Sequence, residues 1–186
     1  MRKLIYTMSV SLDGYIEDQN GSIDFTFPDE DLHLYFNEMD RAIGTYLYGR
    51  RLYETMSAFW PFVKEDESEA EVIKQYSRQW NAKEKIVFSN TLTQVDWNST
   101  LFRGDPVGEI KRLKELPGLD ISVGGSNLAA TFIQNELVDE YNVFIFPFLL
   151  GGGKPMFPHF PKQQKLALLS TKRFFSGVIL LSYRRE

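Results

Sequence analysis

Short apolar runs alternate along this chain with amphipathic stretches, and this alternation predicts an α/β fold. The runs are rich in β-branched and aromatic residues, which favour strands, whereas the stretches space their apolar residues three and four positions apart, which favours helices. The predicted strands are 3–10, 42–48, 85–88, 120–123 and 141–148, and the predicted helices are 29–39, 50–58, 65–82, 107–116 and 126–137. Strands that alternate with helices usually pair in parallel, so we expect a mostly parallel sheet.

The last part of the chain departs from this alternation. Residues 165–170 and 175–183 are both strand-like and flank Ser176 and Gly177, which indicates an antiparallel pair at the end of the sheet. No repeat or long linker divides the 186 residues, a length that suits one globular domain. We therefore expect a single domain over residues 1–186.

Composition narrows the classes of function. The 21 basic and 25 acidic residues leave a net charge of -4, without the positive balance that general nucleic-acid binding needs. Because the chain has no cysteine, disulfides, thiol catalysis and cysteine-bound zinc are excluded. Thr7, Ser9, Ser11 and Asp13 interrupt the apolar residues near the start, unlike a signal peptide or a membrane span. We therefore expect a cytoplasmic protein.

A strand runs into two glycines and then a helix at ISVGGSNL, residues 121–128. A helix N-terminus presents unpaired N–H groups, and glycines let a phosphate approach them closely. The alternative is a tight turn made by Gly124 and Gly125, with Ser126 as the N-cap of the helix. Because the full GxGxxG spacing is absent, this junction by itself leaves both interpretations open.

Two further strand ends favour a phosphate-bearing ligand. Gly49 is followed by Arg50 and Arg51 at the predicted start of a helix, and arginine suits phosphate by its planar fork of donors. The strand 85–88 ends in three short polar residues at 89–91, and open α/β sheets bind ligands along this edge. The glycine run 151–153 is a fourth candidate loop for phosphate. It predicts no P-loop, because a Walker A loop needs a glycine where Phe148 stands and a Ser or Thr where Pro155 stands.

Six motifs follow one another along nearly the whole chain: SLDGYI (11–16), YGRRLYETM (48–56), KIVFSNTL (85–92), VGGSNL (123–128), LVDEY (137–141) and FPFLLGGGKPMF (146–157). Together they resemble the dihydrofolate reductase-like superfamily, and most closely the reductase domain of the bifunctional riboflavin-biosynthesis deaminase-reductase. The resemblance implies a three-layer α/β/α fold with an eight-stranded, mostly parallel mixed sheet and a C-terminal antiparallel hairpin.

The same resemblance implies an NADPH-dependent reductase. Its substrate would be a pterin, a flavin precursor such as a 5-amino-6-(5-phosphoribosylamino)uracil-like compound, or a related small heterocycle. The H-x-E and P-C-x-x-C pattern of the zinc deaminase half is absent, so a role in riboflavin synthesis does not follow directly. The alternatives are a nucleotide- or pterin-binding module without chemistry and a purely structural protein. Members of this branch commonly form homodimers, and the aromatic strand 141–148 is either such an interface or part of the core.

The resemblance also assigns the cofactor site. Gly124, Gly125 and Ser126 would hold the diphosphate, and Arg50 would contact a 2′-phosphate with the help of Ser89. Asn90 stands where the family often has a basic residue, which leaves NADH possible beside NADPH. The other residues expected at the cofactor are Ser9 and Ile16, which border the nicotinamide, and Tyr48, Gly49, Arg51, Thr91, Asn127 and Leu128.

Hydride transfer also needs a proton donor. Asp31 is the nearest match to the carboxylate that dihydrofolate reductases carry on their first helix, and Asp13 is a second candidate in the loop beside the predicted nicotinamide. The alternatives are an ordinary first-turn helix acid for Asp31 and a turn residue for Asp13. His33 and His159 are too far apart to indicate a metal site, and we expect His33 on a helix surface.

Aromatic side chains are concentrated between positions 25 and 62. They either wall a site for a flat heteroaromatic substrate or pack in the core. The residues concerned are Phe25, Phe27, Phe36, Phe59, Trp60 and Phe62.

Overall fold

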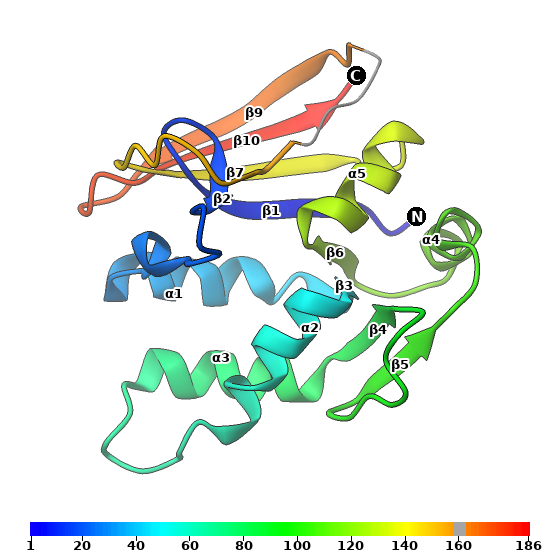
Figure 1. Cartoon of the computed structure of the whole chain (residues 1–186), viewed down its shortest axis with the longest axis horizontal. Coiled ribbons are helices and arrows are strands. Elements are labelled where there is room, and N and C mark those ends of the chain that lie inside the picture. The colour runs from blue at the N-terminus through cyan, green and yellow to red at the C-terminus, as the bar shows by residue number, and fades with distance from the viewer. Residues whose placement is uncertain (158–162) are drawn as a thin grey trace.

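One eight-stranded sheet runs through the protein, with the strand order β5-β4-β3-β6-β1-β7-β10-β9 (Figure 1). The computed structural model describes residues 1–157 and 163–186. The strands are β1 (Leu4–Ser11), β3 (Ile43–Gly49), β4 (Glu84–Phe88), β5 (Ser99–Phe102), β6 (Asp120–Gly124), β7 (Glu140–Phe146), β9 (Leu166–Arg173) and β10 (Ile179–Arg185). The pairings from β5 to β7 are parallel, and β10 and β9 add an antiparallel pair, as predicted.

Helices cover both faces of the sheet. The helices are α1 (Glu30–Asp40), α2 (Arg50–Ser57), α3 (Glu71–Ala82), α4 (Pro106–Glu115) and α5 (Ser126–Gln134), with short 3-10 turns η1 (Asp24–Thr26) and η2 (Trp60–Phe62). Side chains of α4 and α5 pack on one face, and those of α1, α2 and α3 pack on the other. This arrangement is the expected three-layer α/β/α fold.

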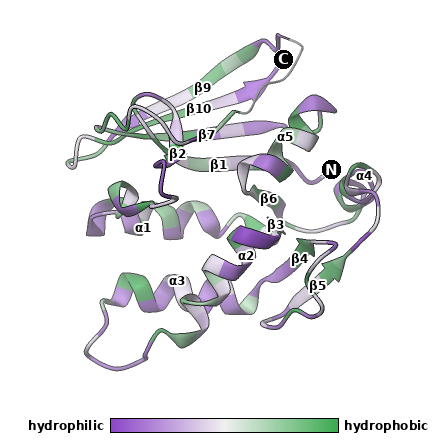
Figure 2. Cartoon of the chain, in the orientation of Figure 1, coloured by the Kyte–Doolittle hydropathy of each residue, from purple (hydrophilic) through white to green (hydrophobic). Residues whose placement is uncertain are grey.

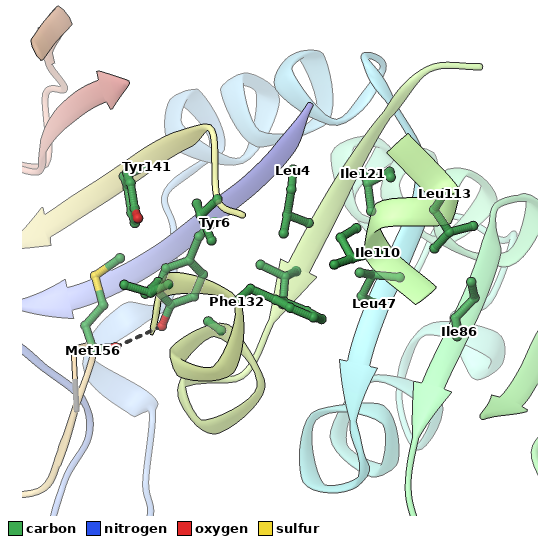
Figure 3. Close-up of a cluster of buried hydrophobic side chains, with 14 of the residues drawn as sticks. Leu4, Tyr6, Leu47, Ile86, Ile110, Leu113, Ile121, Phe132, Tyr141 and Met156 are labelled. Atoms are coloured by element: carbon green, nitrogen blue, oxygen red, sulfur yellow. Dashed lines mark hydrogen bonds between the residues drawn. The ribbon is translucent and has the colours of Figure 1, made fainter. Parts of the chain in front are cut away.

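One large cluster of buried apolar residues lies between the sheet and α4 and α5 (Figure 3), and two further clusters lie on the face covered by α1, α2 and α3. Leu4 and Tyr6 of β1 point to this side, whereas Ile5 between them points to the side of α2 and α3. Phe132 of α5 is completely buried against the strands. Because parallel strands are buried on both faces, they appear in the sequence as nearly continuous apolar runs, and this is why their positions were predictable.

Several element ends differ from the sequence prediction. Helix α3 begins at Glu71 and not at 65, because the side chain of Asp66 accepts the N–H of Ser68, a local bond that competes with the helix. Helix α5 ends at Gln134, three residues early, and Glu136 beyond it has a φ of 56°, which stops the helical path.

Strand β7 carries most of the aromatic residues that the sequence places at 141–148. It lies between β1 and β10, and its aromatic residues Tyr141, Phe144 and Phe146 are buried and part of the core. Phe148 lies beyond the end of β7 and is exposed, and the homodimer stays a prediction.

A small ribbon and the strand β5 were not predicted. Strands β2 (Tyr15–Glu17) and β8 (Lys154–Pro155) pair antiparallel beside the main sheet. The glycine run 151–153 leads directly into β8. Within the residues that the structure describes, no helix has both the length and the apolar character to cross a membrane.

Candidate functional site

The predicted site residues come together at one edge of the sheet. Because β4, β3, β6, β1 and β7 are parallel neighbours, their carboxyl ends all lie at this edge (Figure 1). Gly49 follows β3, Ser89 follows β4, and Gly125 follows β6, so the three phosphate-binding candidates lie on adjacent strands. This is the edge along which open α/β sheets bind ligands.

The two glycines after β6 have structural explanations. A Cβ atom on Gly124 would overlap the end of the Leu52 side chain and lie 3.2 Å from the ring of Tyr48, so the start of α2 packs closely against this glycine and a larger residue would have to displace both side chains. Gly125 has a φ of 90°, in the region that L-residues avoid. The tight-turn interpretation therefore accounts for both glycines.

Ser126 differs from the two glycines, because its hydroxyl makes no hydrogen bond to any described residue. The N-cap of α5 is Gly125, and no side chain caps the helix, so the prediction of Ser126 as N-cap is wrong. Ser126 is 1% exposed, and among the described residues its Oγ has no hydrogen-bond partner. A buried hydroxyl is rarely left unpaired, and here it adjoins the free N–H groups of the first turn of α5. The first-turn N–H groups thus suit an anionic group, which the buried Oγ of Ser126 would meet after a rotation about χ1.

Gly49 has neither a conformational nor a packing reason to be glycine. Its φ is -77°, which any residue adopts, and a Cβ atom on it would meet no atom within 4 Å. Open space therefore lies directly at the N-terminus of α2. A ligand that approaches the backbone at this point would explain the glycine.

Two arginines stand at this open helix start, and Figure 2 shows how hydrophilic it is. The Nη1 atom of Arg50 lies 3.9 Å from Oε1 of Glu54, a long and half-exposed pair. Arg51 places Nη1 and Nη2 at 3.3 and 3.4 Å from the two carboxylate oxygens of Glu17. Glu17 was not among the predicted site residues, because a single acid at the end of a three-residue strand gives no recognisable pattern in the sequence.

Other predicted cofactor residues are arranged less directly. The side chain of Tyr48 is buried and its hydroxyl accepts the Nε1–H of Trp80 at 3.2 Å, so only its backbone can face a ligand. The hydroxyl of Ser89 accepts the N–H groups of Thr91 and Leu92 at 3.2 and 3.0 Å, which shapes the turn after β4. Asn90 in this turn is exposed.

The last four predicted cofactor residues differ in exposure. After β6, Asn127 in the first turn of α5 is exposed, whereas Leu128 packs against the core. On β1, Ser9 is half-buried, and Ile16 of β2 also packs against the core. They lie near the carboxyl edge, so the structure brings the predicted set together even where a side chain points inward.

Asp13 is a hydrogen-bond acceptor in the loop after β1. Its carboxylate accepts the hydroxyl of Ser11 at 2.6 Å and the N–H groups of Leu150 and Gly151 at 3.2 and 2.8 Å. The bond from Ser11, followed by those backbone bonds, lowers the pKa of Asp13. A carboxylate held in its charged form is a poor proton donor, so the geometry gives Asp13 a positioning role.

The glycine run 151–153 supports the ribbon and does not form a phosphate loop. Gly153 has a φ of 140°, and a Cβ atom there would overlap the backbone carbonyl of Glu17. A Cβ atom on Gly152 would meet the side chain of Gln19. Gly153 thus makes room for β2, whereas Gly151 has a φ of 69° and no atom within 4 Å of an added Cβ, so it is a turn glycine.

Asp31 lies in the first turn of α1 and is exposed. The helix begins at the carboxyl edge of the sheet, because it leads to the start of β3 at the opposite edge. Its N-cap is Asp29, which accepts the N–H of Leu32 at 2.9 Å. Among the described residues, the carboxylate of Asp31 has no hydrogen-bond partner and is free to meet a ligand.

The expectation that His33 lies on a helix surface is wrong. Its ring packs edge-on against Trp60 and Tyr76, with ring centroids 6.3 and 6.0 Å away, and burial lowers its pKa. His159 lies outside the described residues. Over the described part of the chain, no three His, Cys, Asp or Glu side chains form a group that could hold a metal ion.

The aromatic residues divide between edge, core and surface. Phe25 of η1 lies edge-on to Phe146 and Phe148, with centroids 6.3 and 6.1 Å apart, at the carboxyl end of β7. Phe36 packs against Phe144 in the core, and Trp60 packs between α1 and α3 with His33 and Tyr76. Phe27, Phe59 and Phe62 are exposed. Of the predicted wall, Phe25 is thus the member at the site edge.

Comparison with known proteins identifies the family and the fold of the chain. Residues 2–180 match the RibD C-terminal domain. The chain is 36% identical over 184 residues to the uncharacterized protein YyaP of Bacillus subtilis (strain 168), which covers 98% of this chain and 94% of YyaP.

Two solved structures show the fold in other proteins. One, assigned to riboflavin biosynthesis in Shewanella sp. PV-4, has a TM-score of 0.77 at 22% identity over 99% of both chains. The other is dihydrofolate reductase from Enterococcus faecalis in complex with NADP(H), with a TM-score of 0.66 at 14% identity over 99% of this chain and 96% of that one. With the match over residues 2–180 and the relation to YyaP, the chain belongs to the RibD C-terminal domain family.

Proposed function

We propose that this protein is an NADPH-dependent reductase that transfers hydride to a pterin, a flavin precursor or a related small heterocycle. The observation that carries the proposal is the buried hydroxyl of Ser126 at the N-terminus of α5, which has no hydrogen-bond partner among the described residues. Family membership and the NADP(H) complex of a protein with the same fold support a nicotinamide cofactor.

The residues present fit a dinucleotide diphosphate. The first-turn N–H groups of α5 and the hydroxyl of Ser126 would donate to its oxygens. The space at Gly49 would admit the ligand to the start of α2, where Arg50 and Arg51 add positive charge. A positive charge opposes the helix dipole at this end, so a stability role does not explain two arginines there.

NADPH is preferred to NADH in this proposal because of Arg50. Its guanidinium makes a long contact with Glu54, at 3.9 Å, and no other ion pair in the described part of the chain, so it remains available to a 2′-phosphate. Asn90 supplies no second charge. The preference should therefore depend mainly on one side chain.

The reacting end would lie beside the loop after β1. A bound nicotinamide supplies the hydride, while the protein aligns the two rings and provides a proton. Asp13 would hold the loop through its bonds to Leu150 and Gly151. Phe25 and Phe148 offer aromatic surface to a flat substrate, and Asp31 would deliver the proton from the start of α1.

The test is a titration with NADPH and NADH, followed by quenching of the three tryptophans. We expect NADPH to bind more tightly, and Arg50→Ala to remove most of that preference, because it should weaken NADPH binding much more than NADH binding. Consumption of NADPH with a panel of pterins and flavin precursors would then identify the acceptor. A protein that binds neither cofactor would refute the proposal.

A second candidate is a binding module of the same fold without chemistry. It is favoured by the state of the two proton-donor candidates, since Asp13 is held as a charged acceptor and Asp31 is exposed to solvent. This candidate predicts tight NADPH binding with no oxidation of NADPH by any heterocycle. The same titration and acceptor panel separate the two functions.

A further inference from the structure

We propose that Glu17 pairs with Arg51 in the ligand-free protein, and that a phosphate of the bound dinucleotide replaces the Glu17 carboxylate as the partner of Arg51. The inference rests on the proposed function, because it requires a diphosphate at the start of α5. It assigns a role to Glu17, an acid that no sequence motif marks.

The pair crosses the proposed diphosphate site. In the sheet, β6 lies between β3 and β1. Arg51 belongs to the helix that follows β3, and Glu17 belongs to the ribbon strand that follows β1. A contact between them must therefore span the carboxyl end of β6, where α5 begins. Leu52, the neighbour of Arg51, packs directly against Gly124 at that point.

The two partners are held very differently. The Glu17 side chain is 18% exposed, whereas that of Arg51 is 63% exposed. Glu17 is also fixed through its backbone, because β2 pairs with β8 and Gly153 fits against the Glu17 carbonyl. The carboxylate is thus the fixed partner, and the guanidinium is the one able to move.

The contact has the geometry of a phosphate contact but not its strength. Two guanidinium nitrogens face two carboxylate oxygens, at 3.3 and 3.4 Å, in the side-by-side manner in which arginine also binds phosphate. Charge-assisted bonds of this kind are usually about 2.7–2.9 Å long. A long pair with one exposed partner contributes little, so a doubly charged diphosphate can displace the carboxylate.

The second arginine provides the comparison. Within residues 1–157 and 163–186, Arg50 has no charged partner across the site, and it meets Glu54 of its own helix at 3.9 Å. In the ligand-free protein, Glu17 therefore compensates one of the two charges that oppose the dipole of α2. Arg50 is available from the outset, and Arg51 becomes available when the phosphate arrives.

The experiment measures the affinity of inorganic pyrophosphate and of NADPH by calorimetry in the wild type, Glu17→Gln and Arg51→Gln. The matched control is Glu38→Gln, which removes the same charge from an exposed pair with Arg41 at the far end of α1. Glu17→Gln removes the competing anion and should tighten both ligands about threefold. Arg51→Gln should weaken both about tenfold, and Glu38→Gln should leave them unchanged.

Opposite signs in the two variants establish the exchange. If NADPH binds the wild type and Glu17→Gln leaves its affinity unchanged or weakens it, the exchange is wrong while the cofactor site stands. If Glu38→Gln tightens binding as much as Glu17→Gln, the effect is one of net charge, and the assignment to Glu17 is also wrong. If the wild type binds neither ligand, the proposed function fails together with the inference.

Discussion

Replacing Ser126 with alanine should affect stability and binding in opposite directions. The Oγ of Ser126 is buried and unpaired among the described residues. An unpaired buried hydroxyl costs about 1–3 kcal/mol, so its removal should raise the free energy of unfolding of the ligand-free protein by about 1 kcal/mol. In the complex the hydroxyl would donate to a phosphate oxygen, and a bond to a charged group contributes about 1.5–3 kcal/mol. NADPH should therefore bind about tenfold to a hundredfold more weakly.

Urea unfolding without ligand and fluorescence titration with NADPH measure the two effects separately. The matched control is Ser182→Ala, because Ser182 is also buried but donates to Oδ1 of Asn142 at 2.7 Å. Its removal should lower the free energy of unfolding by about 1–3 kcal/mol, since it leaves the amide oxygen unpaired, and should not change NADPH binding. If Ser126→Ala destabilises the ligand-free protein as Ser182→Ala does, the hydroxyl has a partner in the protein and the reasoning fails.

Three further outcomes follow from other residues. Asp31→Asn should lower the turnover number about a hundredfold and leave the NADPH affinity unchanged, whereas the control Glu30→Gln should change neither quantity. Equal turnover numbers for the two variants in steady-state assays would reject Asp31 as the proton source. Gly153→Ala should lower the free energy of unfolding, measured in urea, by about 2 kcal/mol or more, because the φ of 140° and the Glu17 carbonyl leave no room for a side chain. An unchanged free energy of unfolding would mean that β2 and β8 can move apart at little cost. Burial lowers the pKa of Lys85 from 10.5 to about 8, so above about pH 8 the unfolded chain binds more protons than the folded protein. The free energy of unfolding, measured by urea titration, should therefore rise by up to about 2 kcal/mol between about pH 8 and pH 9.5. Lys85→Met should lack this rise.

The sheet was predictable because its strands are buried on both faces. The apolar runs that contain Leu4, Leu47 and Ile121 each appear as a short segment of strand-forming residues, and their parallel order follows from the helices between them. Placing the glycine junctions at one edge needs no further information than this order. The ribbon of β2 and β8 was not predictable, because its strands are only three and two residues long and its pairing joins distant segments.

The site could be predicted as a set of positions, but the state of its side chains could not. A serine before a helix is most often an N-cap, and only the φ and ψ angles of Gly125 show that Ser126 is already inside the helix. Asp13 gives the sequence signal of a turn, and its bonds to residues 150 and 151 depend on a loop far away in the chain. The pairing of Glu17 with Arg51 likewise joins two segments that share no pattern.

The glycines of the motifs look alike in the sequence, but in the structure they are glycine for different reasons. Gly124 admits a neighbouring helix, Gly125 adopts a left-handed turn, and Gly153 makes room for the ribbon, so each would be glycine in a protein that binds nothing. Gly49 has an ordinary φ and open space where its side chain would be. A glycine that neither conformation nor packing requires is best explained by a group that the protein itself does not supply. The start of α2 is therefore, with Ser126, the part of the molecule where a ligand explains most.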